Sequence, residues 1–428
     1  MAGADPVSPS NIKTAGTLTF MLRTFKYRNY RLFFGGQIVS LTGTWISITA
    51  TSWLVYRLTG SALLLGVVGF ASQFPSFLLT PFAGIFVDRW DRHRLLVVTQ
   101  TLAMLQSFAL AALTLTGTIT IPRLIALSVV QGLVNAFDMP GRQAFVITLI
   151  EDKRDLGNAI ALNSSMFNAA RLLGPTVAGA LIAVSSEGWC FLIDGVSYLA
   201  VIGSLLAMRV RSTAVAPRKG VSPFDQFKEG WQYTTNSMPI RSIISLIALV
   251  CLVGVPYTVL MPIFADTVFH GGAHTLGFLM TASGGGALVG ALWLASRRSI
   301  HGLTTLIPIA ASVFGLGLVA FAFSRILWLS LALLVITSCG FMVQVASSNT
   351  LLQTIVEDGK RGRVMSFFLM AYFGTTPFGS LLAGSMSEKI GAPLTLAFGG
   401  ACCVGGAIWF ATTRAAIDQD IAPIYARI

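Results

Sequence analysis

The chain has 428 residues, of which 54% are hydrophobic and only 11% carry a charge. Soluble domains have about 25% charged residues, so this composition excludes an ordinary soluble enzyme, a disordered scaffold and a fibrous repeat. A membrane-embedded chain remains, and the net charge of +12 then indicates either a nucleic-acid partner or basic cytoplasmic loops.

Twelve stretches are apolar and long enough to cross a bilayer as helices, which takes about 20 residues each. In chain order they are 32–56, 61–86, 95–117, 122–143, 157–184, 189–208, 241–264, 274–296, 303–323, 327–349, 364–386 and 391–412. We therefore expect an all-α polytopic membrane protein of two pseudo-symmetric six-helix bundles. The expected domains are a tail at 1–31, bundles at 32–208 and 241–412, a linker at 209–240 and a tail at 413–428.

Internal similarity supports two halves. Gly66 in the second stretch matches Gly277 in the eighth, and Gly179 in the fifth matches Gly384 in the eleventh. Parallel repeats of this size are typical of transporters. Chance matches in a chain with 42 glycines are the alternative explanation.

Lys and Arg are distributed unevenly between the two sides. If the N-terminus is inside, the tails and loops on that side hold 24 of them, the opposite side holds four, and Arg171 lies within a stretch. Because basic residues accumulate in cytoplasmic loops, this asymmetry predicts a multi-pass protein of the plasma (inner) membrane with both termini cytoplasmic. It also favours the anionic inner leaflet over a nucleic acid as the partner of the positive charge.

The linker contains a short helical candidate that begins at Ser222. Ser222 is a favourable cap, and Pro223 suits the first helical position. Phe224, Phe227 and Trp231 share one face, which predicts a helix at the membrane interface. A mobile tether between the bundles is compatible with the same pattern.

Polar residues recur at helical spacing inside three stretches of the first half. The first stretch carries Gln37, Ser40, Thr44, Ser47 and Thr51, the fourth carries Gln131, Asn135, Asp138 and Arg142, and the fifth carries Ser164, Asn168, Arg171 and Pro175. Steps of three and four place each set on one helical face. Because polar groups are costly in hydrocarbon, the three stripes predict a shared water-filled cavity, with isolated interhelical hydrogen bonds as the simpler alternative.

Depth along the helices suggests a charge pair. At ~1.5 Å per residue, Asp138 lies ~25 Å and Arg171 ~20 Å from the outer ends of their helices. We expect the two to pair, and protonation of Asp138 to release Arg171; a purely structural ion pair is the alternative. No histidine lies mid-stretch, and Asp194 and Asp266, near helix ends, are weaker candidates for a proton site than Asp138.

The second half supplies aromatic and methionine side chains instead, including Tyr257, Phe341 and Tyr372. A polar wall opposite an apolar wall suits a small amphiphilic substrate. The sequence carries no Gly-rich loop with a lysine, no nucleophile–base arrangement and no spaced metal ligands, so we expect neither an enzyme nor a cofactor or metal. An ion gradient would then supply the energy.

Residues 84–94, GIFVDRWDRHR, resemble the loop between the second and third helices of the major facilitator superfamily. The matching residues are Gly84, Asp88, Arg89, Arg92 and Arg94. The resemblance implies a cytoplasmic gate in which Asp88 caps a helix of the second half near Val364. A carboxylate at a helix N-terminus agrees with this arrangement.

Residues 174–179, GPTVAG, resemble the antiporter pattern of the family's fifth helix, through Gly174, Pro175 and Gly179. In the family this pattern accompanies export. The fourth-helix pattern is half present, because Ser128 stands where an arginine is usual.

The segments beginning at Asn29, Ser52 and Asp138 are similar to the branch that holds the enterobactin exporter and drug-efflux permeases. This resemblance implies a monomeric exporter of a small amphiphilic molecule, such as a siderophore or drug, driven by proton antiport. Uptake by proton symport is one alternative, and a non-transporting membrane scaffold or receptor is another.

Overall fold

The computed structural model describes residues 23–209, 223–297 and 301–425, without the side chains of 81–82, 84–89, 153, 223–227, 358–359 and 422–425. Every regular element in these residues is a helix. Within the described ranges, twelve helical spans are long and apolar enough to cross a membrane, at the positions that the sequence predicted.

The first bundle contains the six spans of the N-terminal half. They are α2 (Arg28–Thr59), α3 (Ala62–Arg89), α4 (Arg92–Leu115), α5 (Ile121–Thr148), α6 (Leu156–Val184) and α7 (Glu187–Ala207). Two short 3₁₀ turns precede α2 and α6, namely η1 (Arg23–Lys26) and η2 (Lys153–Asp155).

The second bundle contains two spans that are not continuous α-helix. The seventh span consists of α9 (Met238–Leu249), η3 (Val250–Gly254), α10 (Tyr257–Ile263) and η4 (Phe264–Val268), where η3 and η4 are wider π-helical turns next to Pro256 and Pro262. The eleventh span consists of α14 (Asp358–Gly374) and α15 (Thr376–Ile390). The remaining spans are α11 (Ala273–Ala295), α12 (Leu303–Phe323), α13 (Leu327–Ile355) and α16 (Ala392–Tyr425).

Local sequence signals set two of the helix ends. Gly60 ends α2 at φ 60°, a left-handed conformation that glycine adopts without steric cost. Asp91 begins α4, and its side chain accepts hydrogen bonds from the backbone N–H groups of His93 and Arg94 at 3.0 Å each. These two ends fix the turns on either side of α3.

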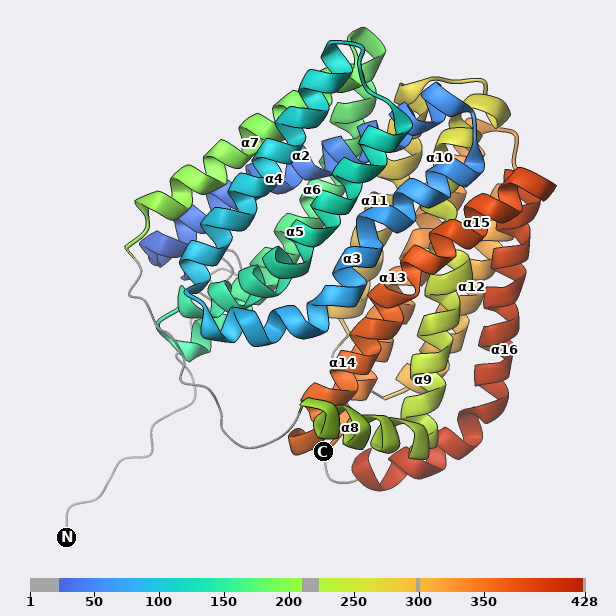
Figure 1. Cartoon of the computed structure of the whole chain (residues 1–428). Helices are drawn as coiled ribbons and strands as arrows, with labels where there is room; N and C mark the ends of the chain where they lie inside the picture. Colours follow the sequence, from blue (N-terminus) through green and yellow to red (C-terminus); the bar gives the residue numbers. More distant parts are fainter. Residues whose placement is uncertain (1–22, 210–222, 298–300, 426–428) are drawn as a thin grey trace, which may run out of the picture.

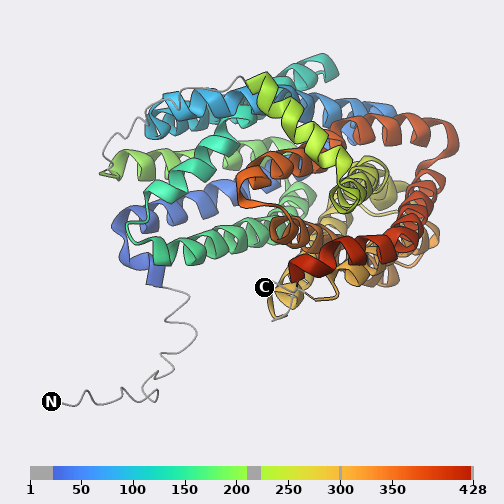
Figure 2. The same ribbon diagram turned by 90° about the horizontal axis from the view of Figure 1, so that it is seen from below.

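The two bundles stand side by side, the first blue to green and the second yellow to red (Figures 1 and 2). We call the end where α2 begins and α16 finishes the termini end, and the opposite one the distal end. The helix α8 (Pro223–Asn236) lies across the termini end of the second bundle (Figure 1). Its Glu229 pairs with Arg363 of α14 at 2.5 Å, and its Trp231 ring lies 5.9 Å from Phe367. The linker helix therefore packs on protein. The predicted cap, Ser222, lies outside the described residues, and the side chains of Phe224 and Phe227 are not among those described.

The bundles meet most closely where glycines face each other. A Cβ on Gly277 of α11 would lie 2.7 Å from the Pro175 carbonyl oxygen and 3.1 Å from Cα of Gly179, both on α6. A Cβ on Gly66 of α3 would likewise lie 2.5 Å from the Ser380 carbonyl oxygen of α15. Both crossings lie in the distal halves of their spans.

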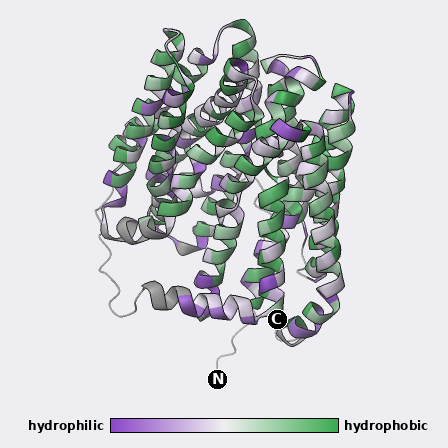
Figure 3. Cartoon of the chain, turned by 45° about the vertical axis from the view of Figure 1, so that its right-hand side comes forward, coloured by the Kyte–Doolittle hydropathy of each residue, from purple (hydrophilic) through white to green (hydrophobic). Residues whose placement is uncertain are grey.

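Large apolar side chains cover the outside of the spans, as lipid requires. Val184 and Trp328 are 83% and 78% exposed. Figure 3 shows hydrophobic colouring along most of the spans and hydrophilic colouring on α8 and at several helix ends. Polar groups inside a span therefore stand out as exceptions.

Candidate functional site: a polar cluster in the first bundle

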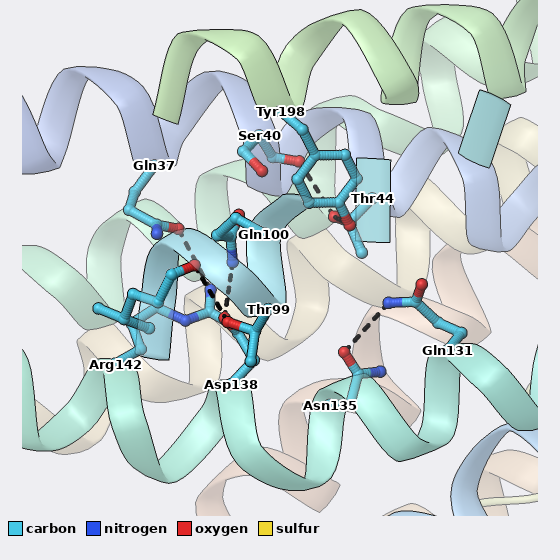
Figure 4. Close-up of polar contacts among 11 residues, drawn as sticks. Gln37, Ser40, Thr44, Thr99, Gln100, Gln131, Asn135, Asp138, Arg142 and Tyr198 are labelled. Carbon is cyan, nitrogen blue, oxygen red and sulfur yellow. Dashed lines mark hydrogen bonds and ion pairs between the residues drawn. The ribbon is translucent and has the colours of Figure 1, made fainter. Parts of the chain in front are cut away.

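A cluster of polar side chains surrounds Asp138 in the interior of the first bundle (Figure 4). Asp138 is 3% exposed, and its Oδ2 lies 2.8 Å from Nη2 of Arg142. Its Oδ1 accepts hydrogen bonds from Thr99 Oγ1 at 2.9 Å and Gln100 Nε2 at 2.7 Å. Gln37 extends the cluster, because Arg142 donates to its Oε1 at 3.3 Å.

The spacing on α5 explains the ion pair. Asp138 and Arg142 are four residues apart, so one helical turn brings their side chains together. Within a bundle interior such a pair needs further hydrogen bonds to offset the loss of hydration. Here α4 and α2 supply these bonds, so three helices satisfy both charges.

The structure does not form the predicted pair between Asp138 and Arg171. The Arg171 guanidinium lies over the Trp45 ring, 5.7 Å from its centroid, while Asp138 pairs with Arg142. The two residues lie on helices that are not close neighbours: α5 packs mainly on α3 and α4, whereas α6 packs mainly on α2 and α11. Similar depth along the membrane normal therefore did not make the two charges neighbours.

A small cavity adjoins the cluster. Its volume is about 40 Å³, and it is lined by Ser40, Leu41, Thr44, Gln100, Ala103, Val134, Asn135, Asp138, Arg142 and Tyr198. That space suffices for water, whereas drug-sized ligands occupy about 300–1,000 Å³. In this conformation the cavity is therefore large enough for water and too small for a drug-sized molecule.

Other predicted residues lie beside the cluster or apart from it. Gln131 donates to Asn135 at 3.1 Å within α5 (Figure 4). Asn168 donates to the Ser164 carbonyl of its own helix at 2.9 Å. Gly174 faces Trp45, where a Cβ would lie 2.4 Å from the Trp45 Cβ. The α5 stripe and Gln37 therefore share one site, and the α6 residues belong to the contact with α2 and α11.

The predicted gate falls largely outside the described side chains. The side chains at positions 84, 88 and 89, which are Gly84, Asp88 and Arg89, are among those not described. Arg92 donates to the Ala144 carbonyl at 3.3 Å, so it contacts α5. Arg363, expected near Asp88, pairs with Glu229 of α8. The proposed role of Asp88 remains a prediction.

Sequence reasoning missed the α4 side of the cluster. Thr99 and Gln100 are both 4% exposed, and Gln106 and Ser107 follow seven residues later, at 7% and 1%. Seven residues are two helical turns, so all four lie on one face of α4. The same period that revealed the other stripes would have found this one.

The second bundle has its own buried polar group. The Tyr257 hydroxyl lies 2.5 Å from Ser283 Oγ and 3.1 Å from Ser338 Oγ. The aromatic side chains expected to form the apolar wall have different surroundings. Phe264 packs inside its own bundle against Phe321, with ring centroids 4.9 Å apart, and Phe341 stacks on Tyr372, with ring centroids 6.2 Å apart. The expected wall is therefore partly an ordinary core.

Residues 21–424 match the family model described as transmembrane secretion effector. The chain belongs to this family. The match confirms the resemblance to the major facilitator superfamily. Within it, the chain is 28% identical to the staphyloferrin A transporter of Staphylococcus aureus over 373 residues, which cover 86% of this chain and 92% of that protein.

A second relative is the multidrug efflux pump Tap of Mycolicibacterium fortuitum, 25% identical over 82% of this chain and 88% of that protein. Among solved structures, a POT family transporter in complex with a thioalcohol-conjugated peptide is similar, with a TM-score of 0.73 at 9% identity, over 91% of this chain and 96% of that one. The family and the fold thus agree with the twelve-helix architecture.

Proposed function

We propose that the protein is an efflux permease that exports a small amphiphilic molecule, such as a siderophore or drug, in exchange for protons. The observation that carries this proposal is the Asp138–Arg142 ion pair inside the first bundle, which receives further hydrogen bonds from α2 and α4 and borders a cavity large enough for water. Such intramembrane charges are expensive and mark substrate or ion pathways. The relatives named for staphyloferrin A and multidrug efflux support export of this class of molecule.

We further propose that the termini end faces the cytoplasm of a bacterial cell, since 24 basic residues belong to that side. The close bundle contacts then lie at the outer end, which corresponds to a conformation closed to the outside. Gln37, Gln131, Asn135, Asp138 and Arg142 would line the pathway in the first bundle. Asn168 and Arg171 would line it on α6, and a monomer would suffice for transport.

The experiment is export of ethidium, used as a probe, from proteoliposomes with an imposed pH gradient. We expect wild-type protein to move the dye against its gradient. Asp138→Asn should slow this movement by about tenfold or more, because it leaves the partly buried Arg142 without its counter-ion. Asp418→Asn is the matched control, since Asp418 pairs with Arg414 at the same i,i+4 spacing but is partly exposed.

Three outcomes separate the alternatives. Dye movement in the same direction as the protons would indicate uptake by symport. Vesicles with wild-type protein that behave like empty vesicles would indicate a scaffold or receptor. Equal rates for Asp138→Asn and wild type would refute the role of the ion pair while leaving transport in place.

A further inference from the structure

Asp194 is a second buried carboxyl in the first bundle. It lies on α7, facing α2 and α4, and is 3% exposed. Ser107 of α4 donates to its Oδ2 at 2.7 Å. Its Oδ1 has no hydrogen-bond partner among the described residues.

The surroundings of Asp194 differ from those of the other buried carboxylates. Asp138 pairs with Arg142, and Glu187 forms a two-bond pair with Arg57 at 2.7 and 3.0 Å. In the described part of the chain, no basic residue lies within ion-pairing distance of Asp194. The titratable groups on α7 and the helices packed against it lie mostly near helix ends: Glu187, Cys190 and Tyr198 on α7; Arg28, Tyr30, Arg31, Tyr56 and Arg57 on α2; Arg171 on α6; and Arg92, His93 and Arg94 at the far end of α4.

An ionised carboxylate in such a place lacks both a counter-ion and enough hydrogen bonds. Burying it would cost several kcal/mol, whereas the neutral acid costs far less. Ser107 donates one hydrogen bond, and the Ser47 hydroxyl of α2 also faces the carboxyl, but neither serine carries a charge. The geometry therefore favours a bound proton. Asp138, with its arginine and two further donors, has the opposite surroundings.

The site is also coupled to the cavity. Gly43 of α2 faces Asp194, and a Cβ there would lie 3.0 Å from Oδ1, so α2 and α7 touch at this point. One turn further along α7, the Tyr198 hydroxyl lies 3.4 Å from Thr44 Oγ1, and both residues line the cavity (Figure 4). A charge on Asp194 would therefore disfavour the close contact of α2 with α7 beside the cavity.

We propose that Asp194 is the exchangeable proton-binding site, and that in this conformation its carboxyl holds the proton. The proposal rests on the proposed function of proton-coupled export. Tyr198 and Thr44 form the polar route between Asp194 and the cavity. Asp194 lies ~10 Å from the distal end of its helix and Asp138 ~25 Å, so the two carboxyls divide the depth of the membrane. In this arrangement the Asp138–Arg142 ion pair contributes to substrate binding. Release of the proton from Asp194 weakens the contact between α2 and α7.

The first test detects the proton directly, without a substrate. Infrared difference spectra of the purified full-length protein, recorded on a pH step, show the C=O stretch of a protonated carboxyl that titrates. We expect this band in wild type and Asp138→Asn and its loss in Asp194→Asn. Ser107→Ala, which removes a hydrogen bond to the ionised form, should shift the band's disappearance to higher pH. A band that persists in Asp194→Asn, or is absent from wild type, overturns the proposal.

The second test uses ethidium in proteoliposomes. Without a pH gradient, Asp194→Asn should still exchange dye across the membrane. With a pH gradient, this variant should not be accelerated as wild type is. Asp194→Glu, which keeps a carboxyl, should restore the acceleration. A merely structural aspartate would affect both equally, and that result would refute the proposal. If wild type moves no dye at all, the proposed function fails, and the infrared titration still decides whether Asp194 binds a proton.

Discussion

At the scale of single residues, the partners of each carboxylate decide what it does. Asp138 has an arginine and two uncharged donors, whereas Asp194 has only serine hydroxyls. Asp155, at the termini end, receives two cations from η1: Arg23 Nε and Lys26 Nζ each lie 2.7 Å from it. The Tyr27 hydroxyl donates to it at 2.9 Å. Asp155 thereby holds η1 and the start of α2 against α6.

This contact predicts a pH dependence. The hydrogen bond from Lys26 lowers the pKa of Asp155 below its ordinary 3.8, and Asp155 raises the pKa of Lys26 above 10.5. A lowered carboxyl pKa gives stabilisation that is present above the unfolded pKa and lost as pH falls. A raised lysine pKa gives stabilisation that is present below 10.5 and lost as pH rises through the folded value. We expect protection of Arg23–Arg31 from hydrogen exchange to be high near neutral pH and to drop below about pH 4.

Asp155→Asn should produce the same loss of protection at neutral pH. Asp152→Asn is the control, because Asp152 lies in the same loop and its side chain contacts the exposed Arg154: it lies 3.4 Å from the Arg154 guanidinium and accepts a hydrogen bond from the Arg154 backbone N–H. The backbone contacts of Asp152 are kept in this variant. Equal protection in both variants would mean that the Asp155 contact does not hold the segment.

At the scale of helices, glycine determines where the two bundles touch. The crossings of α6 with α11 and of α3 with α15 bring backbone atoms into contact with no side chain between them. The four glycines concerned are related by the internal repeat: Gly66 corresponds to Gly277, and Gly179 to Gly384. The structure places each against the non-equivalent partner, so the repeat builds two similar crossings from one pattern.

Gly277→Ala tests this arrangement. The added methyl group would meet the Pro175 carbonyl at 2.7 Å, so we expect a loss of about 1–3 kcal/mol in the free energy of unfolding. Gly405→Ala has nothing within 4 Å of its new Cβ and should be neutral or stabilise by up to about 1 kcal/mol through helix propensity. Denaturant unfolding in detergent measures both; equal stabilities would show that the crossing tolerates a side chain.

At the scale of the whole molecule, two carboxylates link the bundles by hydrogen bonds at the distal end. Tyr56 of α2 donates to Asp266 Oδ2 at 3.0 Å. Glu388 of α15 accepts from Ser61 Oγ and from the Leu63 N–H at the start of α3, at 3.2 Å each. These bonds must break if the bundles separate there, so they stabilise the distally closed conformation relative to the open one.

Tyr56→Phe should therefore favour opening at the distal end. A hydrogen bond to a carboxylate is worth about 1.5–3 kcal/mol, which corresponds to roughly a 10- to 100-fold shift in the equilibrium between the two conformations. Distances between spin labels on α2 and α11 at this end measure the shift. Tyr257→Phe removes a hydroxyl whose two contacts lie within the second bundle, so it should leave the distance distribution unchanged. If Tyr56→Phe and wild type give the same distance distribution, the Tyr56–Asp266 hydrogen bond does not stabilise the distally closed conformation.

Much of this architecture was predictable because lipid imposes a simple rule on sequence. Each span had to be an apolar run, and each polar exception had to be satisfied inside the bundle. The α5 and α2 stripes were therefore visible as periodic patterns. Asp138 was correctly marked as buried, but its partner was misassigned, since residue counts give depth along a helix and say nothing about which helices are neighbours.

The sequence by itself determined the twelve spans, the repeat and the side of the membrane that the basic loops favour, because these depend on local composition and period. Only the tertiary structure decided which polar groups meet. Arg142 reaches Asp138 through one turn of α5, Thr99 and Gln100 complete that site from α4, and Asp194 lies between helices that offer it no cation. Charge states inside a membrane depend on lateral packing, and that packing is a property of the folded bundle.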